Sequence, residues 1–211
     1  RTSAPGDGIF VTRVSASGTI TGDRNVGGLI GEVGDDTYIS HSISTVAITS
    51  PQSGGFADVG GLVGAFRDGS LTDSVSAGSI VIRSDSAGDV GGVLGDASGA
   101  ADAFERIYST TSIEVLSDPD ETTDLGAFIG YLSDGPNVAG NFYLSSAVGN
   151  LGATGAGALA GVRGSTAAEL KSLATYTTDL GDDSWAMIAA SAFQQPTGPN
   201  AQVWGIGSAV N

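Results

Sequence analysis

The chain of 211 residues has no cysteine, one histidine and only eight basic residues. Without cysteine it can form neither disulfides nor thiolate metal sites, and it has no cysteine nucleophile. A single histidine excludes zinc sites that need a histidine pair and hydrolases of the HExxH type. The 23 acidic residues give a net charge of -15, so binding to nucleic acid, which requires a basic surface, is not expected.

The sequence also has no run of about 18 apolar residues, so no membrane-spanning helix is expected. It opens at Arg1 without an initiator methionine or the apolar stretch of a signal peptide, which predicts a segment of a larger parent polypeptide. The acidic surface fits a high-salt, marine or calcium-rich extracellular setting. A β-sheet surface that simply carries solvated carboxylates explains the same composition.

Glycine, by contrast, is abundant, with 34 residues, and it recurs in a repeated hexapeptide. VGGLIG, VGGLVG, VGGVLG and the looser LGAFIG begin at residues 26, 59, 90 and 125, so they are offset by 33, 31 and 35 residues. A constant period of this length indicates a repeat protein. The expected turn glycines of the three closest copies are Gly28, Gly31, Gly61, Gly64, Gly92 and Gly95.

Each hexapeptide is followed by a block of Ser, Thr, Ile and Val whose apolar residues recur with β-like spacing. One repeat then gives three short strands separated by Asp, Ser and Gly turns, which is the length of one coil of a solenoid. We therefore predict an all-β fold, a right-handed parallel β-helix (β-solenoid) of about five coils. One interior column should contain Leu29, Leu62, Val93 and Phe128, and a second should contain Ile43, Val75 and Tyr108.

The pattern degrades after residue 136, and a Gly-rich stretch follows residue 149. Thr166 and Glu169 have the spacing of a capping box, which predicts a helix of about ten residues. Two strands are expected near Trp185 and Trp204. The sequence thus divides into a solenoid over residues 1–150 and a Gly-rich linker with a small helix-plus-strand cap over residues 151–211.

The repeated VGGL[IV]G followed by IxxSx[SA]xGxI resembles the GLUG motif over about residues 9–150. Ala127 and Phe128 depart from it in the fourth copy. Proteins with such repeats are typically secreted bacterial or archaeal surface proteins: large adhesins, filamentous-haemagglutinin-like proteins and the non-catalytic part of some immunoglobulin A proteases. The resemblance implies an extracellular, cell-surface module, and it does not say which host or surface glycan or protein would be the ligand. It transfers no catalytic residues.

The residues themselves offer little chemistry. His41 lies in an alternating strand between serines and lacks a GxSxG partner, so it is interpreted as an exposed strand histidine. The GxGxxA match at residues 155–160 lacks the βαβ context of a dinucleotide site. No cofactor is expected, with calcium as the one possible exception in one interpretation, because a single turn supplies several oxygen ligands. In the alternative interpretation these turn carboxylates are simply solvated. These candidate ligands are Asp118, Asp120 and Glu121.

The sequence therefore predicts a non-enzymatic structural or adhesive module without a nucleic-acid partner. The alternative is a carbohydrate-binding or carbohydrate-cleaving β-helix, in which paired turn carboxylates would act on the glycan. A solenoid end is a template for another chain, and the tail covers only the C-terminal end. End-to-end association into a homo-polymer is therefore expected to involve the first coil, and a head-to-tail contact would give an open filament.

Overall fold

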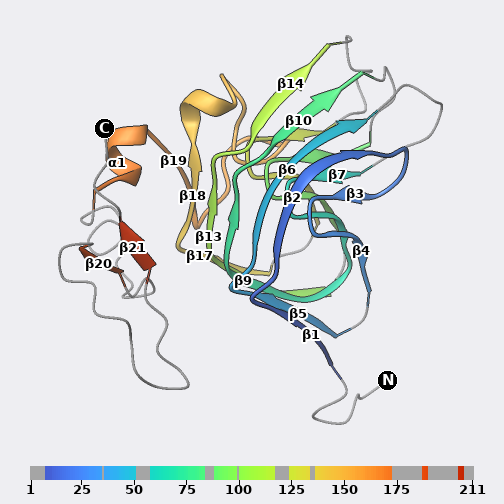
Figure 1. Ribbon diagram of the computed structural model, residues 1–211, viewed down its shortest axis with the longest axis horizontal. Helices are drawn as coiled ribbons and strands as arrows, with labels where there is room; N and C mark the ends of the chain where they lie inside the picture. The colour runs from blue at the N-terminus through green and yellow to red at the C-terminus, as the bar shows by residue number, and fades with distance from the viewer. Residues whose placement is uncertain are drawn as a thin grey trace.

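A computed structural model describes residues 8–34, 36–50, 58–83, 88–98, 100–116, 124–133, 136–172, 187–189 and 204–206. Within them the chain winds into a parallel β-solenoid, as the repeat predicted, with about four turns rather than the expected five (Figure 1). Each hexapeptide supplies one strand to each of two four-stranded ladders. The first ladder contains β3 (Val26–Gly27), β7 (Val59–Gly60), β11 (Val90–Gly91) and β15 (Leu125–Gly126). The second contains β4 (Ile30–Val33), β8 (Val63–Phe66), β12 (Leu94–Ala97) and β16 (Ile129–Leu132).

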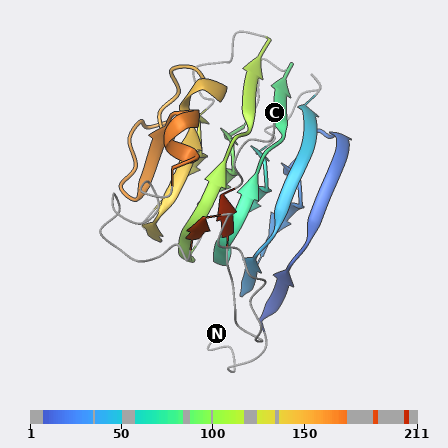
Figure 2. The same ribbon diagram turned by 60° about the vertical axis from the view of Figure 1, so that its left-hand side comes forward.

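The residues that precede the first hexapeptide and those that follow each hexapeptide form the third side of the solenoid, an 11-stranded sheet (Figure 2). Its pairings are parallel and keep equivalent residues of successive repeats opposite one another. The early coils supply β1 (Ile9–Thr12), β2 (Ser15–Thr21), β5 (Thr37–Ser40), β6 (Ile43–Ser50), β9 (Asp68–Ser76) and β10 (Ser79–Ile82). The later coils supply β13 (Ala100–Ser109), β14 (Ser112–Val115), β17 (Asn137–Ala139), β18 (Asn141–Leu144) and β19 (Val162–Ser165).

The hexapeptide leucine position forms the first predicted interior column. Leu62, Val93 and Phe128 are completely buried, and Leu29 is partly buried at the N-terminal end of the column. Backbone hydrogen bonds join successive levels of this column. The N–H of Leu62, for example, donates to the carbonyl of Val93 at 2.9 Å. Beside this column, the rings of Phe66 and Phe104 pack edge to face with centroids 5.2 Å apart. Equivalent residues therefore stack into continuous apolar columns, which no single coil could bury alone.

The second predicted column is in register but does not face the interior. Val75 lies opposite both Ile43 and Tyr108, yet all three side chains are only half-buried. The inward side chains beside them are instead those of Ser44, Ser76 and Ser109, which are buried. The reason is that a residue just upstream in each coil has a positive φ angle, the left-handed backbone conformation, and this shifts the inward–outward alternation of side chains by one residue.

The predicted turn glycines are needed for space rather than for a turn conformation. Gly31, Gly64 and Gly95 lie inside strands β4, β8 and β12, not in turns. A Cβ atom on Gly64 would lie 2.5 Å from the carbonyl oxygen of Gly31 in the preceding coil. Gly28, Gly61 and Gly92 occupy the corner between the two hexapeptide strands, and none of the six has positive φ. These glycines let the backbones of successive coils approach closely.

The Gly-rich stretch after residue 150 continues the hydrogen-bonding of the solenoid. The N–H of Ala127 donates to the carbonyl of Gly152 at 2.7 Å, and the N–H of Phe128 donates to that of Ala153 at 3.1 Å. After the short 3-10 helix η1 (Ser145–Ala147), β19 pairs in parallel with β18. A partial fifth coil therefore extends to Ser165, across the division at residue 150 that the sequence suggested.

The cap is smaller than predicted where the structure describes it. Helix α1 (Ala167–Leu170) has four residues rather than ten. Its capping box is as expected, because the Glu169 N–H donates to the Thr166 hydroxyl at 3.2 Å. In return the Thr166 N–H donates to Glu169 Oε2 at 2.7 Å, and this hydrogen bond to the carboxylate holds the pKa of Glu169 below its usual value. Strands β20 (Met187–Ala189) and β21 (Trp204–Ile206) pair in parallel as a separate two-stranded sheet. Whether this tail covers the end of the solenoid stays a prediction, since Trp185 lies outside the described residues.

Candidate functional site: polar columns on the solenoid

The left-handed residues that bend the third side of the solenoid form a column of their own. The backbone φ angles of Arg13, His41, Asp73 and Arg106 are 58°, 53°, 50° and 54°. The strand registers place these residues opposite one another in successive coils, and Gly140 continues the column. Non-glycine residues rarely adopt positive φ, because the side chain then crowds the backbone. The solenoid therefore repeats a strained position, and in four consecutive coils a titratable side chain occupies it.

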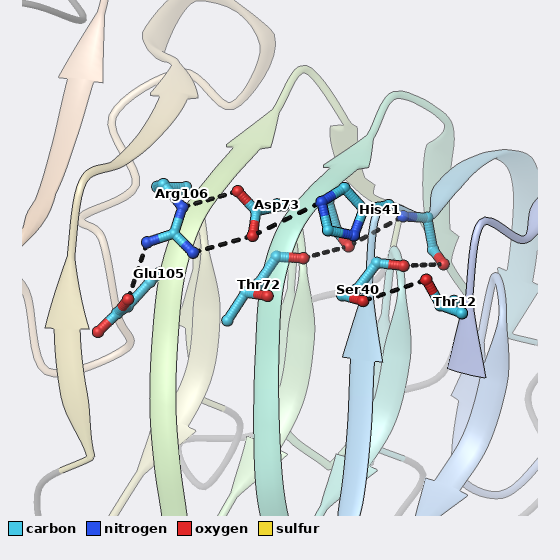
Figure 3. A network of polar contacts seen from close by, with 9 residues as sticks. Thr12, Ser40, His41, Thr72, Asp73, Glu105 and Arg106 are labelled. Atoms are coloured by element: carbon cyan, nitrogen blue, oxygen red, sulfur yellow. Dashed lines mark hydrogen bonds and ion pairs between the residues drawn. The ribbon is translucent and has the colours of Figure 1, made fainter. Parts of the chain in front are cut away.

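Polar contacts connect three side chains of this column, those of His41, Asp73 and Arg106 (Figure 3). Arg106 binds Asp73 through two contacts, Nε to Oδ1 at 2.7 Å and Nη2 to Oδ2 at 2.9 Å, which raise the pKa of Arg106 further above its usual value. Its remaining guanidinium nitrogen donates to Glu105 at 2.9 Å. On the other side, His41 Nε2 lies 4.0 Å from Asp73 Oδ2. These pairs tie three coils together across the bend.

Polar side chains one residue further along point inward and satisfy the backbone at the bend. The Val14 N–H donates to Ser42 Oγ at 3.2 Å, and the Ser42 N–H donates to Ser74 Oγ at the same distance. In the later coils Asn141 takes this role, accepting from the Ile107 N–H at 2.9 Å and donating to the Phe104 carbonyl at 2.7 Å. Buried backbone groups must find such partners. The bend is thus a structural joint rather than an open site.

A second column, of carboxylates, precedes the hexapeptides. Asp58, Asp89 and Asp124 each come directly before the first strand of a coil, and backbone hydrogen bonds of 2.8 Å place them one above another. The N–H of Asp89 also donates to Asp58 Oδ1 at 3.3 Å. We call these three residues, with the neighbouring Glu32 and Asp96 of the second ladder, the acidic column.

Among the described residues, the cation recorded in contact with the acidic column is Arg67, which reaches three of the five carboxylates. Arg67 contacts Asp96, Asp58 at 3.8 Å and Glu32 at 3.9 Å. Asp96 is only 6% exposed, and its Oδ1 has no hydrogen-bond partner, whereas its Oδ2 accepts from Arg67 and, at 2.8 Å, from Ser98. The column therefore keeps an excess of negative charge.

This excess changes how the column titrates. Burial, together with the carboxylates of Asp58, Asp96 and Asp124, raises the pKa of Asp89 to about 7. Burial also raises the pKa of Asp58, against the opposing effects of the Asp89 N–H and of Arg67. The physical cause is that each carboxylate loses water and gains like charges when the coils stack.

We expect stability to fall as the pH rises, because the folded chain holds a proton on Asp89 that the unfolded chain has released. Between pH 3.8 and about 7 the unfolded chain binds fewer protons at this residue, so its contribution to the free energy of unfolding decreases across that interval. Asp89→Asn should flatten this dependence and stabilise the protein at neutral pH. Urea unfolding at a series of pH values measures it, with Asp102→Asn, at an exposed position, as the control. An unchanged pH dependence in Asp89→Asn would refute the assignment.

The proposed calcium ligands Asp118, Asp120 and Glu121 lie outside the described residues, so the calcium site stays a prediction. Within the described residues, no three acidic or histidine side chains are arranged to hold one metal ion. His41 is mostly buried rather than exposed, and its buried Nε2 has no hydrogen-bond partner. Part of the GxGxxA stretch forms an isolated turn, in which the Thr154 N–H donates a hydrogen bond to the Gly157 carbonyl at 2.8 Å.

The sequence interpretation missed both polar columns, although the sequence contains signals for them. Asp58, Asp89 and Asp124 stand immediately before three of the four hexapeptides. The bend residues follow the buried Ile39, Leu71 and Phe104 by two positions. Their chemical identity varies from coil to coil, so only the repeat alignment, not a residue motif, could have revealed them.

Comparison with known proteins gives one similarity. The chain is 34% identical over 155 residues to halomucin from Haloquadratum walsbyi, a match that covers 70% of this chain and 2% of that protein. The chain thus spans about 2% of the length of this curated relative. No family model and no solved structure matches this chain. Among the described residues, no helix is long and apolar enough to cross a membrane.

Proposed function

We propose that the chain is a non-enzymatic structural or adhesive module of an extracellular cell-surface protein. The observation that carries this proposal is the continuity of the solenoid: the interior is sealed by stacked apolar columns, while charged residues are arranged in columns along its sides. The polar groups of the bend are used to join coils, as in a scaffold. The GLUG-like repeats, the similarity to halomucin and the net charge of -15 support an extracellular, high-salt setting.

The scaffold would present its outward columns to a surface glycan or protein, or extend a larger parent polypeptide. The acidic column suits a saline medium, because salt screens the repulsion between its stacked carboxylates, whereas at low salt this repulsion is weakly screened. In cells that produce the protein, an antibody against the chain should label intact cells or the medium. Labelling that requires permeabilised cells would overturn the proposed location.

A carbohydrate-cleaving β-helix is the second candidate, and Asp89 is the observation that favours it. A carboxyl group with a pKa of about 7 beside other carboxylates has the acid–base properties that glycoside hydrolysis uses. The two proposals differ in one measurement, namely turnover of polysaccharides by the full chain. Hydrolysis that Asp89→Asn abolishes and Asp102→Asn leaves intact would replace the structural proposal with the enzymatic one.

A further inference from the structure

Four neighbouring strands of the third side are almost free of charge. β2, β6, β10 and β14 lie side by side in successive coils, and Glu114 is their single charged residue, although the chain has a net charge of -15 (Figure 2). Their pairings keep one register from coil to coil. Core packing explains the apolar inward side chains of these strands, but it places no such constraint on the outward ones. The lack of charge on the outward side therefore needs another explanation.

The outward side chains of these strands are mostly short and end in methyl or hydroxyl groups. Thr45, in the middle of β6, is exposed, and Ala47 beside it is half-buried. Near the bend the surface is more apolar, because Ile43 lies opposite Val75, which in turn lies opposite Tyr108. We call the outward side chains of β2, β6, β10 and β14, together with Val75 and Tyr108, the neutral face.

Charged columns border the neutral face. The bend, with His41, Asp73 and Arg106, lies at one end of it, and the acidic column lies on the hexapeptide sides of the solenoid. Two copies that met through their acidic columns would bring like charges together, which costs free energy. A second copy therefore approaches the neutral face against less electrostatic repulsion than it would meet at the acidic column.

We infer that two copies of the chain associate side by side through their neutral faces at high salt. In the dimer the two sheets pack face to face, about 10 Å apart, around a two-fold axis, so each neutral face covers the other. Strands β6 and β10 are paired along both edges. Additional coils of a parent polypeptide would stack on the ends of the solenoid and leave this lateral face open.

The size of the neutral face predicts a weak, reversible dimer. Four strands spaced by about 4.8 Å, with up to eight residues in each, cover roughly 500 Å² per copy, or about 1,000 Å² in the dimer. This area lies in the range of transient protein contacts. The two copies also repel each other through their net charges of -15, and salt screens that repulsion. Association should therefore be favoured at high salt and lost at low salt.

The first test measures mass against concentration for the full chain by analytical ultracentrifugation, at about 0.05 M and about 2 M sodium chloride. The expected result is a monomer at low salt and a monomer–dimer equilibrium at high salt. Thr45→Lys/Ser79→Lys places two ammonium groups in the middle of the neutral face. It should raise the dissociation constant at least about tenfold, because the dimer would bury unpaired charges.

Ser70→Lys/Thr72→Lys is the matched control. It makes the same two replacements at outward positions of β9, on the charged side of the bend, and it changes the net charge of the chain by the same amount. Lower net charge alone would strengthen association, so the control should dimerise at least as well as the unmodified chain. Urea unfolding shows whether both variants stay folded.

The second test locates the contact without adding charge. Since the chain has no cysteine, Thr45→Cys and Thr72→Cys each introduce one thiol, the first on the neutral face and the second outside it. The rate of reaction with a maleimide is measured at high salt over a range of protein concentrations. The rate at Thr45→Cys should fall as the concentration rises, because the dimer covers this thiol, while the rate at Thr72→Cys should stay constant.

Each outcome decides the question. A high-salt dimer that Thr45→Lys/Ser79→Lys weakens and Ser70→Lys/Thr72→Lys leaves intact, with shielding at Thr45→Cys alone, supports the inference. A monomer at both salt concentrations, a growing series of oligomers, or equal effects at the two pairs of positions would overturn it. Added dextran that shields Thr45→Cys in a monomeric chain would assign the neutral face to a glycan instead. The proposed surface function would stand in each case, because a monomeric module serves it equally well.

Discussion

Gly61→Ala should destabilise the protein by about 3 kcal/mol or more, the upper end of the cost of overpacking. A Cβ atom at residue 61 would lie 2.1 Å from Ser76 Oγ and 2.2 Å from the carbonyl oxygen of Gly92. The serine could rotate, but the Gly92 carbonyl belongs to the backbone of the next coil. Relief therefore requires two coils to separate, which would break the ladder on both sides of the corner.

Gly34→Ala is the matched control for this substitution. No atom lies within 4 Å of the Cβ position at residue 34, and its φ is not positive, so stability should change by less than about 0.5 kcal/mol. Urea denaturation of both variants measures the difference. Equal stabilities for Gly61→Ala and Gly34→Ala would mean that the hexapeptide glycines are not there for close approach.

Leu62→Ala should cost about 2–5 kcal/mol, the range for a leucine removed from a packed core. Leu62 is completely buried in the middle of its column, between Leu29 and Val93, so neighbouring coils cannot close the cavity without losing their register. The free energy of unfolding from urea titration is again the measurement.

Leu116→Ala provides the comparison on an exposed leucine. Leu116 is 52% exposed after β14, and its removal should change stability by less than about 0.5 kcal/mol. A loss at Leu62 no larger than that at Leu116 would contradict the stacked interior of the solenoid. A loss confined to part of the transition would instead indicate that the coils unfold in separate groups, as repeat proteins can.

Much of the architecture followed from repetition in the sequence. The hexapeptide period predicted parallel coils, and the leucine position at residues 29, 62, 93 and 128 predicted one interior column. Repetition is informative here because stacking places equivalent residues in equivalent surroundings, so four weak local patterns support one another. The capping box at Thr166 was equally local, and it is present.

The column of Ile43, Val75 and Tyr108 was assigned to the wrong face because alternation was carried through the bend. Counting in twos from the buried Ile39 brings residue 43 inward, but the left-handed residue at His41 shifts the phase, and Ser44 points inward instead. Histidine, aspartate and arginine at this position give no common residue signal for positive φ. The shift is produced by the ladder, which holds each bend above the one before it.

What the sequence by itself determined is the period, and with it the solenoid, the sealed column of Leu62 and the positions that must be glycine. What only the tertiary structure decided is which polar residues of distant repeats meet: Arg106 with Asp73, and Asp58 with Asp89 and Arg67. The period determines how the coils stack, because the same hexapeptide occurs in every repeat. The facing of side chains and the pKa of Asp89 depend on the bend and on the close stacking of carboxylates separated by about 30 residues, which no local pattern encodes.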